Sequence, residues 1–243
     1  NSYNVAVGYN AGESVSTGTL NTIIGGLAGD ALTSGSRNTA IGYAALSAED
    51  ANGRNVAIGY NALTTLNVGA DAYNVAVGYN AGLAMSTGQQ NTLIGANSGE
   101  AITSGNFNVA VGYLALNAED GHGRNVAVGK GALQLLNAGA DGYNTAVGNL
   151  AGTAMTTGIA NVIVGGLAGD ALTTGSNNVA VGFAALSAED GHGRNVAVGN
   201  GTLQNQNAGS NAYNIAVGYE AGNDITTGTL NTLVGGLAGD AIT

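Results

Sequence analysis

The stretch Asn4-Val5-Ala6-Val7-Gly8 decides the fold, because close copies of it recur along the whole chain. Each copy is Asn, then Val, Thr or Ile, then Ala, Ile or Leu, then Ile or Val, then Gly. Successive copies are 17, 17, 17 and 19 residues apart and the series then repeats, so a 70-residue period lies over the short one. The chain is therefore built from one small structural unit used about 14 times.

Short β-branched runs bounded by Asn and Gly are typical of strands, whereas each Gly would cost a helix about 1 kcal/mol. A unit of 17 to 19 residues has room for two short strands and two turns, which is one coil of a solenoid. We predict an all-β protein, a parallel β-roll or β-solenoid of about 14 short coils stacked about 4.8 Å apart. The uninterrupted repeat predicts a single repeat domain over residues 1–243, and we expect it to be a segment of a longer fibre.

Stacked coils place the first Asn of each unit above the first Asn of the preceding unit. Ladders of Asn stabilise stacked strands, because their amide groups bond from one strand to the next. We therefore assign these residues a structural role rather than a role in ligand binding. The predicted ladder consists of Asn4, Asn21, Asn38, Asn55, Asn74, Asn91, Asn108, Asn125, Asn144, Asn161, Asn178, Asn195, Asn214 and Asn231.

The strand is apolar on both faces. Side chains alternate along a strand, so we expect the second and fourth residues of each motif to fill the interior of the coil and the third to point outward. The third residue is Ala, Ile or Leu in every copy, and a strand that is apolar on both faces is buried on both faces. We predict that a neighbouring chain covers the outer face in a homotrimer. This inter-chain apolar face would include Ala6, Ile23, Ala40, Leu93, Ile163 and Leu233.

The composition excludes several classes of function. Five Lys and Arg stand against fifteen Asp and Glu, a formal net charge of -10, so the chain lacks the clustered positive charge that nucleic acids or anionic membranes attract. No run of about 18 apolar residues is present, so we predict no membrane insertion. There is no Cys, which removes disulfides and thiolate metal sites. We expect no cofactor and no enzymatic activity.

The motif Val-Ala-Val-Gly-Tyr-Asn-Ala at residues 5–11 has the form V-A-I/V-G-x-x-A, and it recurs at residues 56–62, 75–81, 109–115 and 179–185. It resembles the head repeat of the YadA-like trimeric autotransporter adhesins. Thr-Ala-Ile-Gly-Tyr-Ala-Ala-Leu at residues 39–46 is similar to the repeats of phage tail fibres. The resemblance implies a left-handed parallel β-roll packed as a homotrimer. It also implies binding to extracellular matrix, as in adhesin heads, or the presentation of a receptor-binding tip, as in tail fibres.

Three similar loops hold most of the groups that could do chemistry, and they span residues 49–54, 119–124 and 189–194. Each begins with Glu-Asp and ends with Gly-Arg; the second and third contain the two His of the chain, and Asn52 stands in that place in the first. Imidazole and carboxylate groups can hold a divalent ion, and two carboxylates can act as an acid–base pair. The alternative is a solvated turn in which Arg pairs with a neighbouring carboxylate, worth roughly 0–1 kcal/mol. The candidate metal ligands are His122, His192, Asp120 and Asp190.

Tyr recurs in the sixth position, just after the turn Gly. A column of aromatic side chains could bind sugars or make lateral contacts, and the alternative is that the rings pack the turns and stack on one another. The candidate surface-binding aromatics are Tyr9, Tyr43, Tyr60, Tyr79, Tyr113 and Tyr219.

Together these features predict a structural or adhesive fibre segment, the shaft or head of an extracellular trimeric fibre such as a phage tail fibre or a surface adhesin. The expected partners are further copies of the chain, as a homotrimer or an end-to-end polymer, and a host-surface glycan or matrix component. The expected location is extracellular, on a virion, on a cell surface or as a free filament. Three alternatives are an extracellular filament subunit that stacks end to end, a glycan- or matrix-binding adhesin, and a metal-dependent hydrolase that rests on the His-bearing loops.

Overall fold

A computed structural model describes residues 2–242, which form fourteen three-residue strands and no helix. The chain divides into two compact units, one ending at Gly123 and the other beginning at Arg124. In the first unit the strands are β1 (Val5–Val7), β2 (Thr22–Ile24), β3 (Thr39–Ile41), β4 (Val56–Ile58), β5 (Val75–Val77), β6 (Thr92–Ile94) and β7 (Val109–Val111). In the second they are β8 (Val126–Val128), β9 (Thr145–Val147), β10 (Val162–Val164), β11 (Val179–Val181), β12 (Val196–Val198), β13 (Ile215–Val217) and β14 (Thr232–Val234). No described helix has the length and apolar character needed to span a bilayer.

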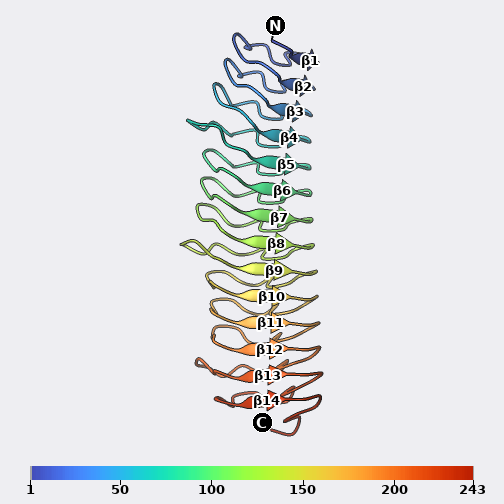
Figure 1. Ribbon diagram of the computed structural model, residues 1–243, viewed down its shortest axis with the longest axis vertical. Coiled ribbons are helices and arrows are strands. Elements are labelled where there is room, and N and C mark those ends of the chain that lie inside the picture. The colour runs from blue at the N-terminus through green and yellow to red at the C-terminus, as the bar shows by residue number, and fades with distance from the viewer. Residues whose placement is uncertain (1, 243) are drawn as a thin grey trace. The chain divides into compact units, whose positions relative to one another are not determined.

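Each unit is a parallel β-solenoid of seven coils, in which every strand pairs with the next one along the chain (Figure 1). The register is set by the repeat, so Val5 pairs with Thr22, and Val56 pairs with Val75 across a longer coil. The two additional residues of that longer coil lie in the loop between β4 and β5, which projects farther than its neighbours (Figure 1). The predicted all-β solenoid of about 14 short coils is confirmed. Each coil contains one strand rather than two, and turns and bends make up the remainder.

The strand faces are the reverse of those expected from the sequence. The middle residue of the strand, the third of the motif, points into the coil: Ile23, Leu93 and Ile163 have no exposed surface in the single chain. The first and third residues of each strand point outward and are exposed or half-buried. The prediction that the middle residues form an inter-chain face is therefore wrong, because the chain's own turns cover them. Of the predicted set, Ile23, Ala40, Leu93 and Ile163 are fully buried, and Ala6 and Leu233, which lie on β1 and β14, are more exposed.

Interior volume is kept constant by complementary residues at the third and ninth positions of the motif. Ile23 occupies the space beside Gly12 and Gly29, since a Cβ on either glycine would lie 2.8 or 3.6 Å from the Ile23 Cδ1. Where the third residue is the smaller Ala40, the ninth is Leu46, which is fully buried at a φ of 55°. A non-glycine residue at positive φ is strained by roughly 1–2 kcal/mol, so burial of the leucine side chain must offset that cost.

Buried Asn side chains run up the coils at the positions predicted for a ladder. The Oδ1 of Asn21 accepts a hydrogen bond from the backbone N–H of Asn38 at 2.9 Å, and its Nδ2 donates to the carbonyl of Gly35 at 2.8 Å. The same two bonds recur at Asn91 and Asn161. Each Asn thus joins its own coil to the next through backbone groups, while direct amide-to-amide bonds such as Asn91 to Asn74 at 3.3 Å are longer.

Candidate functional site

The outward strand face consists of the first and third residues of each strand, and it is uniformly apolar or β-branched. Every one of these residues is Val, Ile or Thr in both units, and none is charged. In the first unit the face includes Ile24 and Ile94, which are 37% and 39% exposed. A parallel sheet normally has both faces covered, so this face is the part of each unit that lacks a covering layer within the single chain.

A buried glutamate interrupts the apolar interior once in each 70-residue period. The twelfth position of the motif is Leu32, Leu66 and Met85 in neighbouring coils, all fully buried, but it is Glu49 in the third coil. Glu119 and Glu189 occupy the same position in their coils, and all three glutamates have no exposed surface. A buried carboxylate costs several kcal/mol unless hydrogen bonds or charges compensate it.

Backbone donors from the following turn hold these carboxylates. The Oε1 of Glu49 accepts from the N–H of Asn52 at 3.1 Å, and its Oε2 accepts from the N–H of Val68 at 3.4 Å. Glu189 accepts from the N–H of His192 at 3.1 Å and from the amide of the buried Gln206 at 3.3 Å. Burial raises the pKa of Glu49 and Glu189 above the ordinary value, and these hydrogen bonds partly oppose the rise.

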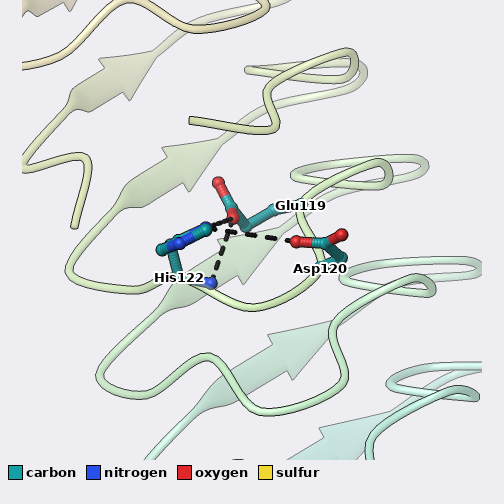
Figure 2. A group of neighbouring side chains, drawn as sticks. All are labelled: Glu119, Asp120 and His122. Carbon is teal, nitrogen blue, oxygen red and sulfur yellow. Dashed lines mark hydrogen bonds and ion pairs between the residues drawn. The ribbon is translucent and has the colours of Figure 1, made fainter. Parts of the chain in front are cut away.

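Each histidine of the loops lies between its buried glutamate and solvent. The Nδ1 of His122 lies 3.5 Å from the Glu119 Oε1 and 4.0 Å from the Asp120 Oδ1 (Figure 2). That Nδ1 is buried and makes no hydrogen bond, although the imidazole as a whole is one-third exposed. Each of the two trios, Glu119-Asp120-His122 and Glu189-Asp190-His192, brings three potential ligand atoms within 4.8 Å of one another.

The loop arginines pair with other partners than the sequence suggested. Arg54 forms an ion pair with Asp71, which lies 17 residues away rather than in the same turn, and donates to the hydroxyl of Tyr73 at 2.8 Å. Its guanidinium lies 5.3 Å from the centre of the Tyr73 ring, a cation–π contact. In the second unit, Arg124 pairs with Asp141 in the same way. The alternative of a wholly solvated turn with a local Arg–Glu pair is wrong, because the glutamate is buried and the arginine bonds across coils.

The Tyr column is exposed, and part of it is stacked. In the first unit Tyr43, Tyr60 and Tyr79 stack with ring centroids 5.3 and 5.4 Å apart. Tyr60 therefore has both ring faces covered and presents its edge and hydroxyl to solvent. Tyr9 and Tyr113 are exposed but separated from the stack by Gly26 and Ala96, and Tyr219 lies in the second unit.

An open groove of about 460 Å³ is lined by Tyr73 and Gln90 in the first unit. Its size falls within the range of small-ligand sites. Tyr73 carries the Arg54 contact beside this groove, so an aromatic ring, an amide and a guanidinium lie close together on the surface.

Comparison with protein-family models, with curated proteins and with solved structures found no match to this chain. The resemblance to YadA-like heads and to tail-fibre repeats stays a prediction drawn from the motif.

The candidate metal ligands of the sequence prediction were incomplete. His122 and Asp120 lie together, as do His192 and Asp190, but the sequence interpretation did not single out Glu119 and Glu189 as further members of each group. Aligning the units by position would have found them, because Glu is the one charged residue type at a position otherwise held by Val, Leu, Ile, Met or Gln.

Proposed function

We propose that the protein is a structural and adhesive segment of an extracellular fibre, in which three copies associate along the outward strand face. The observation that carries this proposal is the chemistry of that face, which holds only Val, Ile and Thr in the strands of both units. Apolar strips of this extent on soluble proteins mark interaction surfaces.

A second copy of the chain is the occupant that fits this face best. Without charged groups, the face offers no complementarity to an acidic or basic partner, whereas another copy presents the same flat apolar strip at the same residue spacing. Closed symmetric assemblies are the usual form of self-association. The resemblance to trimeric adhesin heads favours three copies. The apolar face expected from the sequence is thus replaced by the opposite face of the same strands.

Native mass tests the proposal. Light scattering on a sizing column is expected to give about three times the 23.5 kDa of one chain. The double variant Ile24→Lys with Ile94→Lys, which places two charges on the outward strand face, is expected to give a single-chain mass with an unchanged circular dichroism spectrum. Asn67→Lys, at an exposed position away from the strands, serves as the control and should leave the assembly intact. A wild-type protein that stays monomeric at all concentrations would refute the trimer, and unlimited growth would favour end-to-end polymers.

A glycan- or matrix-binding adhesin is the second candidate, favoured by the groove beside Tyr73. Sugar rings pack on aromatic side chains while amide and guanidinium groups bond to their hydroxyls, and Tyr73, Gln90 and Arg54 supply these groups. On a glycan array, a binding signal is expected to fall at least about tenfold in Tyr73→Ala, a loss of roughly 1.4 kcal/mol. Tyr9→Ala removes an exposed ring elsewhere and should preserve the signal. An array without signal from the folded chain would count against this candidate.

A further inference from the structure

The buried glutamates of the second and third loops have a feature that the first loop lacks. In all three loops the carboxylate accepts the backbone N–H three residues later. In the second and third loops that residue is a histidine, which adds an imidazole nitrogen beside the carboxylate. The hydrogen bond that holds the turn does not require the imidazole, because Asn52 makes the same backbone contact.

The distances within the trios match those of a coordination shell. Zinc binds nitrogen and oxygen ligands at about 2.0–2.2 Å, so two ligands of a tetrahedral site lie about 3.3–3.6 Å apart. The Nδ1 of His122 is 3.5 Å from the Glu119 Oε1, and the Nδ1 of His192 is 3.3 Å from the Glu189 Oε1. The Asp120 Oδ1, at 4.0 Å from the Nδ1, needs only a small side-chain movement, which its exposed position permits.

Two further observations indicate a ligand rather than a hydrogen-bonded turn. The His122 Nδ1 is buried with no hydrogen-bond partner, and a buried polar atom without a partner costs about 1–3 kcal/mol. In addition, Glu119 places a carboxylate where the adjacent coil has the apolar Ile102. A divalent cation would satisfy the orphaned nitrogen and compensate the buried carboxylate together.

We propose that Glu119-Asp120-His122 and Glu189-Asp190-His192 each bind one divalent transition-metal ion of the zinc type. The buried glutamate is the anchoring ligand, the histidine supplies the nitrogen, and the exposed aspartate closes the site toward solvent, with water completing the shell. A set of one imidazole and two carboxylates suits zinc and its neighbours better than calcium, which prefers six to eight oxygen ligands.

The first loop is the chain's own control. There Asn52 replaces the histidine, and its side-chain amide donates to the carbonyl of Val68 instead of facing Glu49 with a free nitrogen. The first loop is therefore expected to bind no zinc, although it keeps Glu49 and Asp50 in the same positions of the repeat.

Zinc titration of the full chain at pH 7.5 tests the proposal, with stoichiometry from calorimetry and from elemental analysis after dialysis. Two equivalents per chain are expected. His122→Asn and His192→Asn, each reproducing the natural first loop, should leave one equivalent and weaken the altered site at least about tenfold, since even outer-shell changes cost 10–100-fold. Asn52→His should add a third equivalent. Asp224→Asn removes an exposed carboxylate from outside the loops and should change nothing.

Cobalt provides an independent readout, because a nitrogen- and oxygen-ligated tetrahedral Co²⁺ has characteristic visible absorption bands. These bands should appear on cobalt addition and disappear in the double histidine variant. If that variant fails to fold, Asp120→Asn with Asp190→Asn changes only exposed ligands and should still weaken binding. The proposal is overturned by the absence of saturable binding below about 100 μM zinc, or by two full equivalents in the folded histidine or aspartate double variants.

Discussion

Replacing Gly95 with Ala is expected to lower the free energy of unfolding by at least about 4 kcal/mol, or to prevent stable folding. A Cβ at this position would lie 2.5 Å from the carbonyl oxygen of Gly112 and 2.7 Å from its carbon, so backbone atoms of the next coil would have to move. The φ of Gly95 is 132°, a conformation that costs a residue with a side chain roughly 1–3 kcal/mol by itself. Solenoid stability depends on each coil contacting its neighbours, so an error in one coil disrupts both interfaces.

Gly69→Ala is the matched control for this experiment. Gly69 lies in the same unit, but a Cβ there would meet nothing within 4 Å, and its backbone is outside the left-handed region. Urea denaturation followed by circular dichroism should give Gly69→Ala a midpoint close to that of the wild type. Midpoints that agree for the two variants would contradict the close stacking of the turn glycines.

Replacing Asn91 with Ala is expected to cost about 2–6 kcal/mol of stability. Asn91 is fully buried; its Oδ1 accepts from the N–H of Asn108 at 2.9 Å, and its Nδ2 donates to the carbonyl of Gly105 at 2.8 Å. Removal of the side chain takes a partner from two backbone groups in the interior, and each buried group left unsatisfied costs about 1–3 kcal/mol. The measurement is the shift in urea midpoint and in melting temperature relative to the wild type.

Asn67→Ala provides the comparison, because Asn67 is an exposed residue of the same unit. Its substitution is expected to change stability by less than about 0.5 kcal/mol. If Asn91→Ala proved as mild as Asn67→Ala, the buried Asn column would be a consequence of the repeat rather than a source of its stability.

The repeat itself made the coil count, the parallel stacking and the Asn column predictable. A fixed spacing of 17 or 19 residues forces equivalent residues above one another once any two coils pair in register, as Val5 and Thr22 do. The position of Asn21 beside Asn38 follows from that register alone. Local strand propensity and turn chemistry agreed with this arrangement, so no long-range information was needed.

The direction of each strand face was decided by the tertiary structure. Both faces of the strand are apolar in sequence, so alternation alone gives no sign for the interior. The path of the turns after Gly25 brings Ala28 and Leu32 back onto the side of Ile23, and this closes the coil over the middle residue. The outward Val, Ile and Thr side chains are left for a partner by the same closure.

The sequence by itself determined the repeat, the fold class, the Asn column and the pairing of His with carboxylates in two loops. The tertiary structure decided which side of the strand is the core, and it placed Glu119 and Glu189 inside that core behind the histidines. The physical reason is that burial is a property of how successive coils close around a side chain. A Glu at the twelfth position is identical in sequence to a surface Glu, and only the coil around it removes it from water.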